Sequence, residues 1–114
     1  MNISIVAGTV SSAPEVRTLP SGDLVTTLSM TADGLVKVSV PLSLTNEATA
    51  SALAVGDRVV VRGYVQRRFF RTAGTTQSRT ELVVSEFALA GKRRDVRKLV
   101  AKVERDLGEL AQLA

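Results

Sequence analysis

The stretch that most constrains the fold is residues 55–70, VGDRVVVRGYVQRRFF, where a Gly-Asp turn precedes a run of β-branched and aromatic residues. Alternation along a strand separates this run into two faces. One face is small and apolar, with Val59, Val61, Gly63 and Val65. The other is basic and aromatic, with Arg58, Val60, Arg62, Tyr64, Gln66, Arg68 and Phe70. A straight strand of this length would reach about 45 Å, so we expect it to bend around a small barrel, with Gly63 allowing close approach of another backbone.

Positive charge is concentrated on the same part of the chain. Residues 58–94 hold nine basic and two acidic side chains, a net charge of +7, whereas residues 1–57 carry −3 and residues 95–114 carry zero. Basic residues gathered on one element are typical of proteins that bind nucleic acid. A solvated basic face is the plain alternative, and charge alone does not choose between the two interpretations.

Two residue types that catalysis often depends on are absent, because the chain has no cysteine and no histidine. Disulfides, thiolate nucleophiles, Cys-ligated metals and Ser-His mechanisms are thereby excluded. We find no other nucleophile-base, metal or phosphate-loop motif, so we expect a non-enzyme without cofactor, metal or small-molecule substrate. The N-terminus lacks the pattern of a signal peptide and no apolar run is long enough to span a membrane, so we expect a cytoplasmic location.

The remaining patterns predict short strands around the long one. Period-two alternation places them at residues 3–10, continuing after a kink at 15–18, then at 24–31, 35–42 and 77–89. Asp33 and Gly34 predict a tight hairpin, and residues 72–75 another loop tip. In the last strand we expect a bulge near Ser85 and a core of Leu82, Val84 and Phe87. An alanine-rich segment at 45–53 predicts a short helix.

These elements together predict an all-β fold, a five-stranded OB-fold barrel with a short helix between strands 3 and 4 and a C-terminal α-helix. We expect the barrel domain at residues 1–91 and an amphipathic helix at 92–114. The helix carries an apolar heptad stripe made of Val96, Val100, Val103, Leu107, Leu110 and Ala114, widened by Leu99 and Leu113. Such a stripe packs either on its own barrel or across a subunit boundary.

Several segments, in order and at the right spacing, resemble the bacterial single-stranded DNA-binding proteins (SSB). They are Asn2, residues 8–10, residues 14–18 (PEVRT), Ser21 with Gly22, and the long strand. The resemblance covers about residues 2–90. It implies a non-catalytic protein that binds single-stranded DNA by base stacking and by Lys and Arg contacts to phosphates. It also implies a homo-oligomer, a dimer or tetramer, with a role in DNA replication and repair at the nucleoid.

The chain also departs from this family. It has no tryptophan, although the family stacks bases on tryptophan. Phe70 falls where one stacking tryptophan is expected, Val36 stands in place of another, and Leu42 in place of a stacking phenylalanine. A helix occupies the place of the family's flexible tail with its acidic tip. These departures leave open an alternative function, an OB-fold protein-interaction module that has lost most DNA binding.

Seven residues are candidates for nucleic-acid binding. Phe70 is the best stacking candidate, with Tyr64 sharing its face, although a Tyr at a subunit interface is equally consistent with the pattern. The expected phosphate contacts are Arg62, Arg67, Arg68, Arg71 and Arg79. Strand parity places Phe69 on the inner face with Val65, and we expect Glu81 and Glu86 to be surface residues without a catalytic role.

Overall fold

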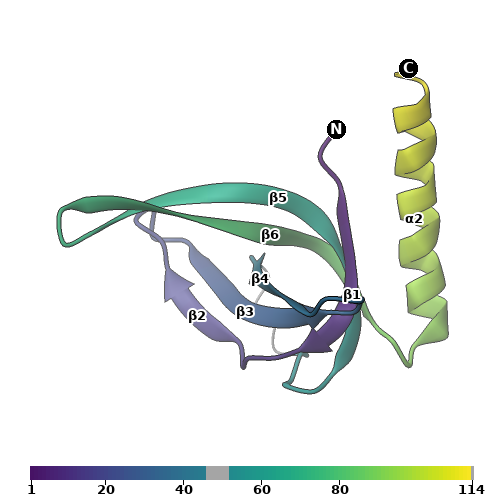
Figure 1. Cartoon of the computed structure of the whole chain (residues 1–114), viewed down its shortest axis with the longest axis horizontal. Helices are drawn as coiled ribbons and strands as arrows, with labels where there is room; N and C mark the ends of the chain where they lie inside the picture. Colours follow the sequence, from purple (N-terminus) through teal and green to yellow (C-terminus); the bar gives the residue numbers. More distant parts are fainter. Residues whose placement is uncertain (46–51, 114) are drawn as a thin grey trace.

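The computed structural model describes residues 1–45 and 52–113 of the chain. It contains a series of strands followed by one helix (Figure 1). The elements are β1 (Ser4–Val10), β2 (Glu15–Thr18), β3 (Leu24–Ala32), β4 (Val38–Leu44), β5 (Arg58–Thr72), β6 (Thr75–Leu89) and α2 (Arg93–Ala111). The predicted helix at 45–53 lies largely on residues outside the described part of the chain.

The strands form one closed barrel with an extension. Their order in the sheet is β1-β5-β6-β4-β3-β2, and an additional pairing of β1 with β3 closes the barrel. All pairings are antiparallel except β4 with β6, where Leu42 and Ser43 lie beside Leu82 and Val83. The short strand β2 adds to the outer end of β3. This is the connectivity of an OB fold, so the predicted five-stranded barrel is confirmed.

The barrel core is built from the alternating apolar residues of every strand. Its fully buried members are Val10, Leu28, Met30, Leu42, Leu44, Leu53, Val59, Val61 and Leu82. Val84 and Phe87 pack against this cluster, as the sequence predicts. Val65 shares the parity of Val61 but is 47% exposed. The inner face of β5 is therefore buried up to Gly63 and partly exposed at Val65, the last position of β5 in the barrel wall.

The predicted bulge in the last strand lies at Ser85. Arg62 is opposite Glu86, and Gly63 is opposite Val84, so Ser85 is the extra residue of β6. A Cβ atom at Gly63 would overlap with the carbonyl oxygen of Val83, and Gly63 is correspondingly buried. Since bulges increase local twist, this position lets the long pair of strands curl around the core. The expectation that Gly63 allows a close backbone approach is confirmed.

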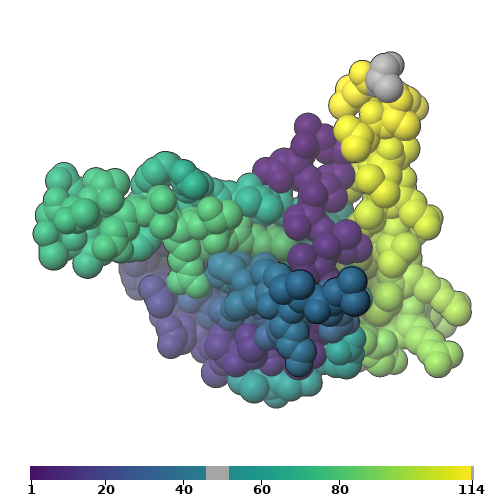
Figure 2. Space-filling view, viewed as in Figure 1, coloured from purple at the N-terminus to yellow at the C-terminus, as the bar shows by residue number. Residues whose placement is uncertain are grey.

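Beyond Val65 and Leu82, the last part of the hairpin in the barrel wall, β5 and β6 leave the barrel and form a two-stranded arm, residues 66–81. The arm projects from the barrel on the side away from α2 (Figures 1 and 2). Ala73 and Gly74 form its tip with φ angles of 51° and 78°, the left-handed conformation that two-residue hairpin turns require. At the base of the arm, the side chain of Asn2 donates to the carbonyl of Val65 (2.8 Å) and accepts from its N–H (3.2 Å). These two hydrogen bonds extend the pairing of β1 with β5 beyond Ser4, the first residue of β1.

The tight hairpin predicted at Asp33 and Gly34 is wrong. Ala32 pairs with Val38, so residues 33–37 form a longer loop, and Leu35 and Val36 are exposed. Asp33 instead accepts hydrogen bonds from Arg58 at the far end of the barrel from the arm. This hydrogen bond raises the pKa of Arg58. The Asp-Gly pair follows the end of β3. The loop from residue 33 to residue 37 is longer than a two-residue turn because β4 pairs from Val38 and Asp33 is held by Arg58.

Helix α2 packs on the outer surface of β5 and β6. Its Leu99 and Val103 are buried against Ala88, with Val60 and Val96 beside them. One flank of the helix is held by ion pairs of Lys102 with Glu86 and of Asp106 with Arg62. Glu86, which we expected at the surface, is partly exposed there and is paired with Lys102. No helix in the described residues is long and apolar enough to cross a membrane.

Only the first part of the stripe on α2 is covered by its own barrel. The C-terminal part of the helix extends beyond the strands (Figure 1). Leu107, Leu110 and Leu113 there are 51%, 44% and 71% exposed. Val100, on the flank away from Lys102, is 38% exposed. Packing on the barrel therefore accounts for about half of the apolar stripe.

Replacing Gly63 with Ala should destabilise the protein, because the new methyl group meets the Val83 carbonyl and the Leu82 side chain. Overpacking of this kind costs about 1–3 kcal/mol in the free energy of unfolding, measured by urea denaturation. Gly91→Ala is the matched control, since a Cβ there meets no atom within 4 Å. Equal stability of the two variants would contradict the close approach at Gly63.

Candidate nucleic-acid interface

The arm has two faces, and the ladder between β5 and β6 determines which side chains share each. Gln66 lies opposite Glu81, Arg68 opposite Arg79, and Phe70 opposite Gln77. These residues form the first face. The second face carries Arg67, Phe69 and Arg71, opposite Thr80, Ser78 and Thr76.

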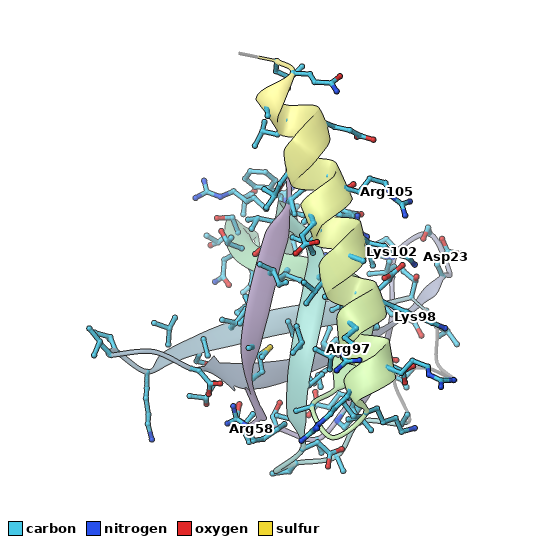
Figure 3. The ribbon with its side chains drawn as sticks, turned by 90° about the vertical axis from the view of Figure 1, so that its right-hand side faces the viewer. Asp23, Arg58, Arg97, Lys98, Lys102 and Arg105 are labelled. Carbon is cyan, nitrogen blue, oxygen red and sulfur yellow. The ribbon has the colours of Figure 1, made fainter. Side chains whose placement is uncertain are left out.

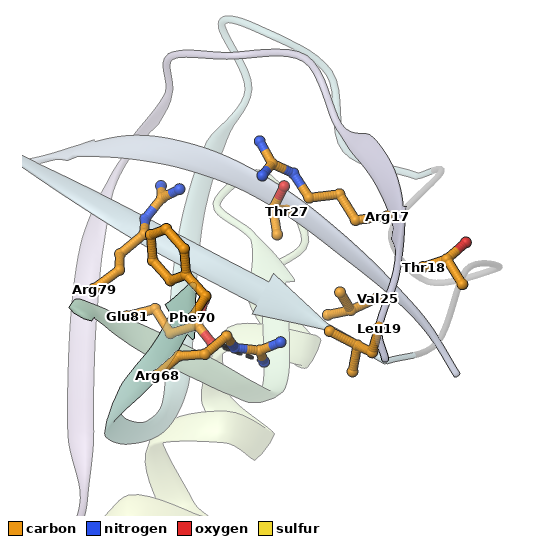
Figure 4. Close-up of a pocket in the computed structure, with 9 residues that line it drawn as sticks. All are labelled: Arg17, Thr18, Leu19, Val25, Thr27, Arg68, Phe70, Arg79 and Glu81. Carbon is orange, nitrogen blue, oxygen red and sulfur yellow. Dashed lines mark hydrogen bonds and ion pairs between the residues drawn. The ribbon is translucent and has the colours of Figure 1, made fainter. Parts of the chain in front are cut away.

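The first face of the arm looks onto β2 and β3 across a cleft of about 240 Å³ (Figure 4). The cleft is lined by Arg17, Thr18, Leu19, Val25, Thr27, Arg68, Phe70, Arg79 and Glu81. A second cavity of about 300 Å³ shares Arg17, Thr27 and Arg79 with it and continues towards Ser12 and Ser29. The two cavities therefore form one concave surface beneath the arm, which we call the arm cleft.

Phe70 is the aromatic residue of the arm cleft. It is 41% exposed, so one part of its ring packs and another is free to contact a ligand. The expectation that Phe69 faces a core is wrong. Its side chain is 66% exposed on the second face of the arm. The parity was assigned correctly, but the strand has left the barrel at this point and no core remains to cover that face.

An ion pair crosses the first face. Arg68 donates from Nε to Oε1 of Glu81 at 2.9 Å, and Gln66 approaches the same oxygen at 3.5 Å. Glu81 is only 5% exposed, so the prediction that it is a surface residue is wrong. Its carboxylate lies inside the arm cleft, and Arg68 supplies the charge that a buried carboxylate needs. The period-two pattern of β6 places Glu81 on the face opposite Leu82, so the burial of Glu81 follows from the register with β5, where Glu81 lies opposite Gln66 and near Arg68.

Two of the predicted residues, Arg62 and Tyr64, do not line the cleft. Arg62 forms an ion pair with Asp106 of the helix, and its Nε is enclosed without a hydrogen-bond partner among the described residues. Tyr64, two residues along the same strand, is 39% exposed. Arg62 therefore fastens α2 to the barrel wall, and its charge is already matched by a carboxylate.

Three predicted arginines are exposed and, within residues 1–45 and 52–113, have no ion pair: Arg67, Arg71 and Arg79. Arg79 lies directly opposite Arg68, and like charges at opposed positions destabilise a sheet. A local arrangement that costs stability is common where a charged ligand is bound. The structure thus brings together Arg68, Phe70 and Arg79, and it places Arg67 and Arg71 on the other face of the same arm.

The sequence did not single out the opposite wall of the cleft. Arg17 and Thr27 come from β2 and β3, and Arg17 is exposed with a weak contact of 3.4 Å to Glu15. Only the pairing of β2 with β3, where Arg17 lies opposite Val25, places this guanidinium beneath the arm. Among the described residues, no group of three or more His, Cys, Asp and Glu side chains could hold a metal ion.

The comparison with solved structures finds the same fold in a DNA-binding protein. The chain is similar to the Plasmodium falciparum SSB in its complex with ssDNA, with a TM-score of 0.65 and 20% identity, over 78% of this chain and 94% of that chain. No family model and no curated protein matches the sequence. At this identity the likeness shows the fold, an SSB-like OB barrel, while membership of the bacterial family stays a prediction.

Replacing Arg68 with Ala should lower the thermal stability, because it leaves the carboxylate of Glu81 buried without a cation. For a pair whose arginine is partly exposed we expect a loss of about 1–3 kcal/mol, measured by thermal or urea unfolding. Arg79→Ala is the control, since it removes an exposed guanidinium opposed to Arg68. If both variants were as stable as the parent protein, Arg68 would not support Glu81.

Proposed function

We propose that this protein binds single-stranded DNA without catalysing a reaction, and that the arm cleft and the exposed arginines of the arm form the binding surface. The observation that carries the proposal is the position of Phe70 and Arg79 facing Arg17 across one cleft of an OB barrel. Every single strand, whatever its sequence, has bases that can stack on an aromatic ring and phosphates that can pair with arginines. The likeness in fold to an SSB–ssDNA complex supports the same ligand.

In the proposed mechanism a strand enters beneath the arm. A base stacks on Phe70, while its flanking phosphates contact Arg79 on β6 and Arg17 on β2. Arg67 and Arg71, on the second face, hold the strand as it passes around the arm. Arg68 contributes less charge, because Glu81 already neutralises it. Each stacked base is worth about 1–3 kcal/mol, so with one ring in the cleft the arginines carry a large share of the affinity.

A titration of labelled oligo-dT at several salt concentrations, followed by fluorescence anisotropy, tests this function. If Arg17, Arg67, Arg71 and Arg79 each neutralise one phosphate, the slope of log K against log salt should be about −3, from roughly 0.7 per phosphate. Arg79→Ala should make the slope shallower by about 0.7. No binding at low salt would contradict the proposal.

The matched control is Arg105→Ala. Arg105 lies on α2 (Figure 3), on the side of the molecule away from the arm, and it has no ion pair among the residues that the structure describes. The substitution therefore removes one exposed guanidinium and leaves the proposed binding surface unchanged. An equal change of slope in both variants would mean that any exposed arginine contributes and that the arm is not the site.

We further propose that the protein is a homo-oligomer and that the exposed part of α2 is the contact between copies. Val100, Leu107 and Leu110 follow the heptad spacing that two helices share when they pack together. Residues 92–98 carry five basic and one acidic side chain, whereas residues 99–113 carry two basic and three acidic ones. Antiparallel pairing of two α2 helices would therefore set opposite charges beside each other.

The double variant Leu107→Gln with Leu110→Gln should lower the mass measured by light scattering, because it removes the apolar seam. Leu35→Gln is the control, since Leu35 is fully exposed in the loop after β3. An unchanged mass of the double variant would exclude this contact. A monomeric parent protein would instead favour the alternative function, an OB-fold module whose helix binds a different protein.

A further inference from the structure

The second face of the arm carries an aromatic ring to which the proposed function gives no role. Phe69 lies on β5 between Arg67 and Arg71, and none of these three residues lines the arm cleft. All three side chains are exposed, as are the hydroxyl-bearing residues of β6 that lie opposite them. The opposing residues are Thr80, Ser78 and Thr76. The second face is therefore a ring flanked by two guanidiniums on a hydroxyl-lined ribbon.

Exposure of one apolar side chain is common on protein surfaces and is not by itself evidence of a site. Phe69 is distinguished by the degree of exposure and by its neighbours. It is 66% exposed, against 41% for Phe70 and 39% for Tyr64. Its neighbours on the same face are cations and hydroxyl groups, so no other apolar side chain of the arm covers it. A partner that covers the ring has to accommodate those cations as well.

The charge of this face determines what kind of partner fits. Residues 66–81 include four arginines and one acidic residue, Glu81, which lies on the first face and is paired with Arg68. Arg67 and Arg71 form no ion pair within the described residues. An apolar surface placed on Phe69 would desolvate these guanidiniums without matching their charge. A partner with a flat ring and an anionic group on each side matches all three side chains.

The spacing of the three residues suits a single strand. Arg67 and Arg71 each lie two residues from Phe69, about 7 Å along the strand, so their flexible side chains can reach phosphates on both sides of a base on the ring. The regular ladder from Gln66 to the turn at Ala73 and Gly74 holds the ring and the two cations on one face in advance. Such preorganisation lowers the entropic cost of binding.

We propose that Phe69 is a second stacking site, so that one strand passes around the arm with one base on Phe70 and another base on Phe69. Arg67 and Arg71 pair with the phosphates on either side of the second base. The two rings are consecutive in a strand and point to opposite faces, so a single base cannot contact both. This inference rests on the proposed function and adds a second ring and a wrapped path to it.

Tryptophan fluorescence tests the contact directly, because the chain has no tryptophan and one introduced ring reports alone. Phe69→Trp keeps an aromatic ring at the position. We expect its emission to be strongly quenched when oligo-dT saturates the protein at low salt, since a base stacked on the indole quenches it. Phe70→Trp reports on the arm cleft in the same way. Quenching at position 70 without quenching at position 69 would overturn the inference.

Leu35→Trp is the matched control. Leu35 is fully exposed in the loop of residues 33–37, at the far end of the barrel from the arm. An indole there should keep its emission when oligo-dT binds. Equal quenching at positions 35 and 69 would also overturn the inference, because any exposed ring would then meet the strand.

Phe69→Ala gives an independent measurement. We expect about tenfold weaker binding of oligo-dT at constant salt, within the range known for one stacked base. The slope of log K against log salt should stay that of the parent protein, because no charge is removed. Thermal unfolding should also be unchanged, since the ring is exposed. Affinity equal to that of the parent protein would contradict a stacking role.

Light scattering without DNA separates a nucleic acid from a second copy of the chain as the partner of Phe69. The mass of Phe69→Ala should equal that of the parent protein, and a lower mass would overturn the inference in favour of a contact between copies. The experiments also separate the two proposals. Failure of the parent protein to bind any strand at low salt contradicts the proposed function, whereas binding that leaves position 69 unaffected contradicts only this inference.

Discussion

The structure depends on the close approach of β5 and β6 at Gly63. There the carbonyl of Val83 occupies the space of a side chain, and Ser85 is added to β6. This bulge allows one long hairpin to form a wall of the barrel and then to continue as the arm. The same row of β5 side chains consequently meets different surroundings. Arg62 lies beneath α2, whereas Arg68 and Phe70 face the cleft over β2 and β3.

Ion pairs divide the basic residues of the hairpin into two groups. Arg62 is bound to Asp106 and Arg68 to Glu81, so these two guanidiniums mainly hold the helix and the cleft in place. The remaining arginines of the arm point into solvent without such partners among the described residues. Because a bound carboxylate and a phosphate compete for the same guanidinium, the second group is the better source of affinity for a polyanion.

The side of the barrel opposite the arm is organised by α2. The helix covers Val60 and Ala88 but not β1, where Ile5 is 46% exposed. Lys102 and Asp106 orient the helix so that its apolar flank, with Val100 and Leu107, turns away from β6. This placement separates an apolar surface near α2 from the basic arm, so contact with another protein and contact with a single strand would not exclude each other.

The sequence by itself determined the barrel, because period-two alternation, turn residues and the glycine at position 63 depend on local geometry and on one buried face. It also indicated the bulge at Ser85, the arm tip and the helix. Only the tertiary structure decided where side chains of one strand end up once that strand leaves the core. Phe69 therefore became exposed, Glu81 became buried by its pairing with Arg68, and Arg17 came to face Phe70 from a distant segment. These outcomes depend on strand register and curvature across the barrel, and no local pattern specifies which distant residues those features bring together.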